Sequence, residues 1–86
     1  MSAITDQPQL RDFVDLREML SRDDVRAAFP TEQSLRWFVR NHRSELVQAD
    51  ALIALTNRLR FHPANFQRAA VDIGRRVLLQ REGIAA

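Results

Sequence analysis

The chain has 86 residues, of which 45% are hydrophobic and 28% charged, as expected of one small folded domain and not of a disordered chain. It has no cysteine, which excludes disulfides and thiolate metal sites. No apolar run approaches the roughly 20 residues that span a bilayer, and MSAITDQPQL lacks the basic head and apolar core of a signal peptide, so we expect a cytoplasmic protein without a membrane partner.

The net charge of +2 is unevenly distributed. Residues 1–32 carry seven Asp/Glu and four Arg, whereas residues 33–86 carry nine Arg and four Asp/Glu, which predicts an anionic partner for the second part. All 13 basic residues are Arg, whose planar guanidinium matches phosphate oxygens and guanine edges in a bidentate manner. The alternative explanation of the bias toward Arg is a GC-rich genome, which favours Arg codons whatever the function.

The first predicted helix covers residues 9–20, after a polar segment, residues 1–8, where we expect a flexible N-terminus. Asp6 stands at a possible cap position and Pro8 near the first turn. The apolar residues recur at helical spacing; they are Leu10, Phe13, Val14 and Leu20.

A short second helix is predicted from Ser21, which forms a variant of the capping box with Asp24. Pro30 ends this helix, because the residue before a proline is pushed out of helical geometry. Its expected buried side consists of Val25, Ala28 and Phe29.

The third predicted helix begins after Thr31, a suitable cap, with Glu32 at the positive end of the dipole. The pattern predicts that the helix continues through residues 42–50. Its core face consists of Leu35, Phe38, Val39, His42 and Leu46, and the other face of Gln33, Arg36, Trp37, Arg40, Arg43 and Ser44.

The spacing of the hydrophobic residues changes in residues 52–62, which we expect to form a β-hairpin. An apolar run is followed by Leu59 and Phe61 alternating with Arg58, Arg60 and His62, which is typical of a strand, and the turn falls at Thr56-Asn57. Helical spacing resumes at Ala64 and ends near Gly83. The predicted core consists of Val25, Phe29, Leu35, Phe38, Val39, Leu46, Ile53, Leu59, Phe61 and Phe66.

The predicted fold is mainly α with a small two-stranded β-hairpin, an extra N-terminal helix and a long C-terminal helix. It forms a single domain over residues 9–82, followed by a tail at residues 83–86. Self-association through an outer helix is an alternative to simple covering of the core. The apolar residues available for it are Leu10, Phe13, Val14 and Leu20, or Ile73, Val77, Leu78 and Leu79.

No catalytic site, metal site or cofactor site is predicted. His42 lies on the apolar face, where a packed histidine is expected, and His62 at a strand end is expected to be a surface or phosphate-contacting residue; the two lack any ligand spacing. Asp23 and Asp24 are explained by the helix dipole. Gly74 cannot build a phosphate-binding loop.

The polar face of the third helix favours double-stranded DNA as a partner. An α-helix fits the major groove, where Arg reads guanine and Gln reads adenine, while Thr31 and Ser34 can donate to phosphate. Trp37 either seals the core or contacts DNA. The alternative for the whole face is an ordinary solvated surface. The expected contact residues are Thr31, Gln33, Ser34, Arg36, Trp37, Arg40 and Arg43.

Hairpin arginines support the same partner. Arg60 alternates away from Leu59 and Phe61, so we expect it to be exposed, and a hairpin carrying Arg58 and Arg60 can lie in the minor groove as a wing. The expected wing contacts are Asn57, Arg58, Arg60 and His62.

Two stretches, MLSRDDVRAAFPTEQSLRWFVRNHR and ALIALTNRLRFHPANFQRAA, resemble the winged helix-turn-helix of the MerR-like excisionase and AlpA-type regulators. The likeness covers roughly residues 19–70. Residues 34–39 stand at the opening of that family's recognition helix, and residues 52–66 where its wing and following helix begin. The turn Thr56-Asn57 lacks the usual glycine of the family's wing.

The resemblance implies sequence-specific DNA binding by the third helix and the wing. Members of this family act as transcription regulators or as recombination directionality factors, which bend attachment-site DNA in several copies so that an integrase excises a mobile genetic element. We therefore expect an excisionase-like architectural factor with an integrase or recombinase as a further partner. A repressor or activator of the same fold is one alternative, and a small helical adaptor that binds a protein is another.

Overall fold

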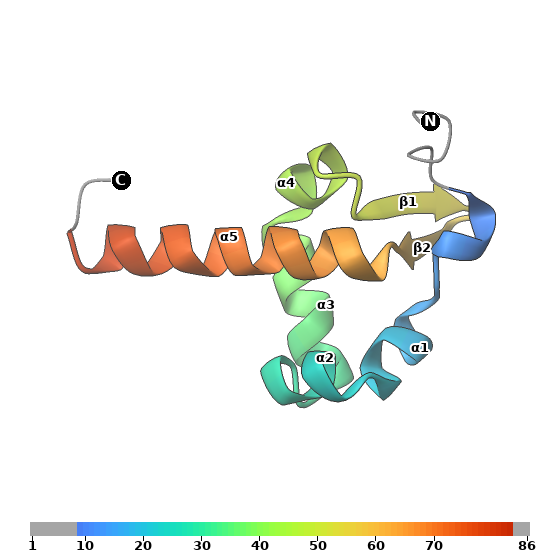
Figure 1. The fold of residues 1–86 in the computed structure, drawn as a ribbon, viewed down its shortest axis with the longest axis horizontal. Coiled ribbons are helices and arrows are strands. Elements are labelled where there is room, and N and C mark those ends of the chain that lie inside the picture. Colours follow the sequence, from blue (N-terminus) through green and yellow to red (C-terminus); the bar gives the residue numbers. More distant parts are fainter. Residues whose placement is uncertain (1–8, 84–86) are drawn as a thin grey trace, which may run out of the picture.

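The computed structural model describes residues 9–83. The chain is mainly helical with one small antiparallel sheet (Figure 1), which confirms the coarse fold class. The expected flexible N-terminus, with Asp6 and Pro8, and residues 84–86 lie outside the described part. In chain order the elements are the 3-10 helix η2 (Leu10–Asp12), α1 (Leu16–Ser21), α2 (Asp23–Ala28), α3 (Glu32–Asn41), α4 (Arg43–Gln48), β1 (Leu52–Leu55), β2 (Arg58–Phe61) and α5 (Pro63–Arg81).

The prediction of one helix over residues 9–20 is wrong. After η2 the chain is extended, and Val14 forms an antiparallel bridge with Phe61, with N–O distances of 2.7 and 2.8 Å in the two directions. Asp15 then caps α1 by accepting from the amide of Glu18 at 2.8 Å. The free edge of β2 offers backbone groups that must be paired, and pairing them interrupts the helix.

Ser21 does not cap α2, as the sequence suggested. It is the last residue of α1, and its hydroxyl donates to the carbonyl of Glu18 at 2.7 Å. Arg22 occupies the cap position of α2 without a side-chain hydrogen bond. The predicted cap of α3 is confirmed: Thr31 Oγ1 accepts from the amide of Ser34 at 3.0 Å.

The predicted continuation of α3 through residues 42–50 is also wrong. The helix stops at His42, whose φ of −128° and ψ of 26° are not helical, and α4 starts at the next residue. The ring of His42 packs against Phe38, with centroids 4.8 Å apart, and its Nδ1 lies 3.3 Å from Glu45 Oε1. The break redirects the chain while Leu46 still reaches the core.

The predicted hairpin is confirmed. β1 and β2 pair from Leu52 with Phe61 to Leu55 with Arg58, and the turn residues Thr56 and Asn57 have φ values of 48° and 64°. Positive φ at both central residues is what a tight type I′ hairpin turn requires.

The core lies where α1, α2, α3, α4, the hairpin and the first half of α5 meet. Phe66 packs on Phe61 and Phe38 at centroid distances of 5.5 and 6.1 Å. Ile53, expected in the core, is not part of it. The predicted core lacks five of the buried residues, namely Met19, Ala51, Leu52, Ala69 and Ile73. The buried residues are Met19, Val25, Leu35, Val39, Leu46, Ala51, Leu52, Phe61, Phe66, Ala69 and Ile73.

Candidate nucleic-acid interface

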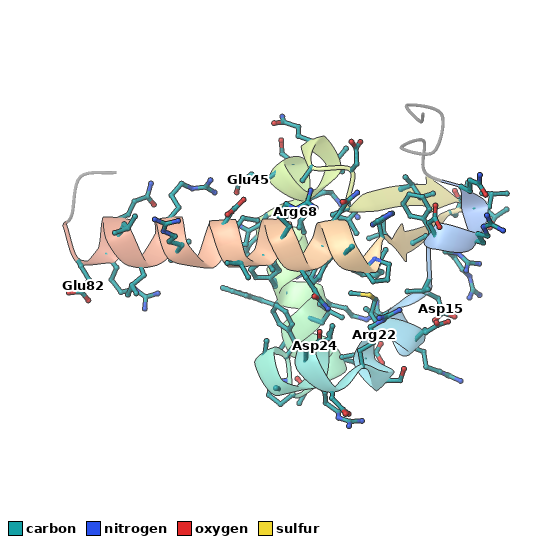
Figure 2. The ribbon with its side chains drawn as sticks, viewed as in Figure 1. Asp15, Arg22, Asp24, Glu45, Arg68 and Glu82 are labelled. Atoms are coloured by element: carbon teal, nitrogen blue, oxygen red, sulfur yellow. The ribbon has the colours of Figure 1, made fainter. Side chains whose placement is uncertain are left out.

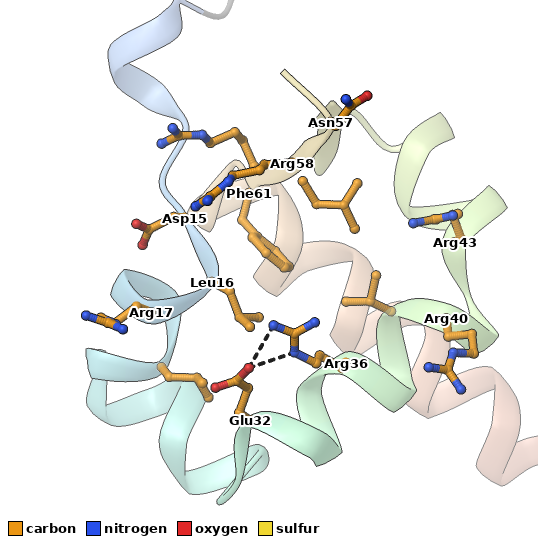
Figure 3. A pocket seen from close by; sticks show the side chains of 14 residues that line it. Asp15, Leu16, Arg17, Glu32, Arg36, Arg40, Arg43, Asn57, Arg58 and Phe61 are labelled. Atoms are coloured by element: carbon orange, nitrogen blue, oxygen red, sulfur yellow. Dashed lines mark hydrogen bonds and ion pairs between the residues drawn. The ribbon is translucent and has the colours of Figure 1, made fainter. Parts of the chain in front are cut away.

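A groove of about 920 Å³ opens between α1, α3, the start of α4 and the hairpin (Figure 3). Six arginines line it, together with Asp15, Glu32, Asn57 and a floor of Leu16, Leu20, Val39, Leu59 and Phe61. We call it the arginine groove. Its arginines are Arg17, Arg36, Arg40, Arg43, Arg58 and Arg60. With six guanidinium groups and two carboxylates, the groove is strongly positive.

Helix geometry explains how one side of the groove is built. Positions 32, 36 and 40 follow each other at four-residue spacing, which places them on one face of α3. Leu35 and Val39 hold the adjacent face in the core, so Arg36 and Arg40 point outward. Arg43, the first residue of α4, continues this row.

The opposite side of the groove comes from β2. Arg58 is exposed at the start of the strand, next to the turn, and Asn57 lies beside it. Figure 3 shows the Arg58 side chain extending toward Asp15, with Arg40 and Arg43 on the other side of the groove. Residues separated by more than a dozen positions in the sequence thus share one surface.

Glu32 and Arg36 form a forked ion pair inside the groove. Arg36 Nε and its terminal nitrogen lie 2.8 and 2.7 Å from Glu32 Oε2. Both side chains are more than half exposed, so the pair is weak, worth about 0.3–0.5 kcal/mol for such i, i+4 contacts. It orients Arg36 without removing it from solvent.

Arg60 is not exposed as the simple strand alternation predicted. It is half-buried, and its Nε is buried without a hydrogen-bond partner among the described residues. The cause is the extra pairing of Val14 with Phe61, whose register places Asp15 opposite Arg60. Arg60 still lines the groove.

Thr31 and Ser34 are engaged in the cap of α3. Ser34 Oγ donates to the carbonyl of Thr31 at 2.7 Å and accepts from its amide at 3.2 Å. Donation by Ser34 to an outside phosphate would have to replace this bond, so the structure weakens that expectation.

Gln33 and Trp37 are exposed but do not line the groove. Each follows a groove-lining residue, Glu32 or Arg36, and therefore lies about 100° further round α3. Trp37 exposes 62% of its surface, which excludes the interpretation that it seals the core. Gln33, Trp37, Arg36 and Arg40 together form the outward face of the helix.

His62 is a structural residue here. Its Nδ1 accepts from the amide of Asn65 at 3.2 Å, which caps α5, and its ring meets Phe13 edge-on with centroids 5.4 Å apart. The expectation that His62 contacts phosphate from the hairpin is therefore not supported.

Sequence reasoning missed Arg17 and Asp15, which line the groove from α1. No local signal marks them, because only the packing of α1 beside β2 brings them there. Within residues 9–83, no cluster of three His, Asp or Glu that could hold a metal ion is found. In the same part of the chain, no helix combines the length and the apolar character needed to cross a membrane.

Comparison with known protein families, with curated proteins and with solved structures finds no match to this chain. Its function therefore has to be inferred from the groove and the surfaces around it.

Proposed function

We propose that the chain binds double-stranded DNA as a winged helix-turn-helix, with α3 in the major groove and the hairpin as a wing. The observation that supports this most is the arginine groove itself, in which guanidinium groups from α3, α4 and β2 line one surface. A phosphate backbone lying along it would meet several cations at once, and release of its counterions would drive binding.

In this proposal the outward face of α3 supplies the side chains that contact base edges in the major groove. The helix has ten residues, and Arg36 and Arg40 suit guanine while Gln33 suits adenine. The α2 helix precedes α3 by only three residues, the connection of a helix-turn-helix. Trp37 packs on the sugar-phosphate backbone or a thymine methyl.

The hairpin supplies the wing. Arg58 and Asn57 stand at its turn end and line the same groove as the arginines of α3. Narrow minor grooves carry an enhanced negative potential that attracts inserted Arg. One duplex can therefore engage both sets of side chains in adjacent grooves.

Within this function we propose a non-enzymatic, excisionase-like role in the cytoplasm, in which several copies bend attachment-site DNA for an integrase. The resemblance over residues 19–70 supports it, and so does size, since a single small module buries little surface on DNA. The same fold also suits a repressor or activator. Ladders of shifted species together with bending on attachment-site DNA would favour the first role, and a single unbent complex at a promoter the second.

The first prediction concerns three of the exposed groove arginines. Changing Arg40, Arg43 and Arg58 to Ala should weaken duplex binding by an order of magnitude or more. It should also lower the slope of log K against log salt by roughly 0.9 for each phosphate that the variant no longer neutralises. Fluorescence anisotropy with a labelled duplex at several salt concentrations measures both quantities.

A matched control removes the same charge elsewhere. Arg11, Arg68 and Arg75 are exposed and lie outside the groove, so their triple Ala variant should keep most of the affinity. Equal losses of duplex affinity in both triple variants would attribute the effect to net charge alone. Unchanged duplex affinity in the groove variant would favour the alternative, a small helical adaptor that binds a protein.

A further inference from the structure

The end of α5 projects from the body of the protein (Figure 1). Ile73 is the last buried residue of this 19-residue helix, and Figure 1 shows α5 running past α3 and α4. The radius of gyration, 13.9 Å, exceeds the roughly 12 Å expected of a compact chain of this length. Val77 still packs, partly buried, against the core and Arg76 pairs with Glu45 of α4, so we call only residues 78–81 the overhang.

An apolar stripe runs along α5 from the body into the overhang. Val71 and Leu78 expose 67% and 53% of their surfaces, far more than large apolar residues of a covered helix would. The stripe is symmetric about Gly74, because its apolar members lie three and four residues to either side; they are Ala70, Val71, Val77 and Leu78.

Gly74 is open to a close approach. A Cβ placed there would meet no atom within 4 Å, so no side chain covers the backbone at the centre of the stripe. A neighbouring helix could therefore cross here with little separation between backbones.

An apolar hollow of about 200 Å³ flanks the first half of the stripe. Its walls come from α2 and α5 and include Ala28, Phe29, Ala70 and Val71, with Asp24 and Gln67 at the polar edge. A side chain projecting from a helix laid along the stripe would enter this hollow.

We propose that the stripe binds the same stripe of a second copy, so that two α5 helices pair antiparallel and cross at Gly74. A two-fold interface must be self-complementary, and the pattern around Gly74 meets that condition. In this register Leu78 faces Ala70 and the hollow of the partner, while Val71 faces the partner's Val77.

Charge complementarity favours a second copy of this chain as the partner of the stripe. Arg81 lies seven residues after Gly74 and Gln67 seven before it, so the two positions face each other in the antiparallel pair. Gln67 Nε2 donates to Asp24 Oδ2 at 2.5 Å, which fixes the carboxylate of Asp24 beside that position. Figure 2 shows Asp24 under the first half of α5 and Glu82, next to Arg81, at the far end. Arg81 of each copy therefore lies beside Asp24 of the other copy, and the two-fold symmetry gives two such contacts.

The second prediction tests this pairing by analytical ultracentrifugation without DNA, so its outcome is independent of the proposed function. A helix pair of this size should give a weak, concentration-dependent dimer. Leu78→Asp should weaken the dimer at least tenfold. Asp24→Arg and Arg81→Asp should each weaken it, and the double variant, which restores opposite charges, should recover most of the wild-type association.

Matched controls lie away from the stripe. Asp72→Arg, about 160° round α5 from Gly74, and Arg11→Asp, at an exposed position in η2, make the same charge changes and should leave the dimer intact. Circular dichroism shows whether each variant keeps its helices. A wild-type chain that stays monomeric up to millimolar concentration would overturn the proposal, as would a double variant no better than its parents or controls that lose the dimer equally.

Discussion

A lone tryptophan is usually largely buried, yet Trp37 exposes 62% of its surface. Its position decides this: Leu35 and Val39 turn their side of α3 to the core, and Trp37 lies on the opposite side. A large aromatic ring held in water by a rigid helix is suited to contact a partner.

The third prediction follows for Trp37. Trp37→Ala should change the free energy of unfolding by no more than about 0.5 kcal/mol, as for other exposed positions, while weakening duplex binding. Urea unfolding followed by circular dichroism measures the first quantity.

Phe66 provides the contrast for that measurement. It is 1% exposed and packs on three other phenylalanine rings, so Phe66→Ala should cost about 3–5 kcal/mol. A comparably large loss for Trp37→Ala would mean that the indole supports the fold after all.

At the scale of elements, tertiary pairing overrides local pattern in two places. Residues 9–20 have helical periodicity, but the isolated bridge between Val14 and Phe61 divides the segment into η2 and the start of α1. The long pattern after Thr31 is divided at His42, whose packing on Phe38 ends α3. Both breaks shape the arginine groove, because they position Asp15 and Arg43.

The fourth prediction concerns the hairpin turn. Thr56 has a φ of 48°, which is unfavourable for a β-branched residue and better tolerated by Asn. Thr56→Asn should therefore stabilise the protein, by no more than the roughly 1–2 kcal/mol that the left-handed conformation costs most residues. Thermal and urea unfolding measure the gain.

Thr56→Ala is the matched control for the turn. It removes the same hydroxyl, which donates to the carbonyl of Leu55 at 2.7 Å, but keeps the unfavourable φ. It should not stabilise the protein, and a gain equal to that of Thr56→Asn would attribute the effect to the hydroxyl.

At the scale of the whole molecule, two surfaces are available at once. The arginine groove lies between α1, α3 and the hairpin, whereas the apolar stripe lies on α5, beside α2. The ion pair of Glu45 with Arg76 joins α4 to α5. A dimer through α5 would therefore leave each groove free for DNA.

The fifth prediction uses a shortened chain that ends at Val77. Every fully buried residue precedes this point, so the midpoint of thermal unfolding should fall by only a few degrees, about 4–8 °C for each kcal/mol lost in a domain of this size. Loss of Leu78 and Arg81 should abolish the dimer. A shortened chain that still dimerises would place the contact elsewhere.

The local features of this protein can be predicted from its sequence. The cap at Thr31, the hairpin turn at Thr56-Asn57, the start of α5 at Pro63 and the helical faces of α3 all follow from nearest-neighbour chemistry, which acts within a few residues. The positive charge of the second part of the chain was equally visible in the sequence.

Which of these features lie together depends on the tertiary fold. The burial of Met19 and Leu52, the partial burial of Arg60, the entry of Arg17 into the groove and the overhang of α5 depend on contacts between residues distant in the chain. Such contacts leave no periodic signal, because their free energy arises when separate elements pack together and not within any one of them.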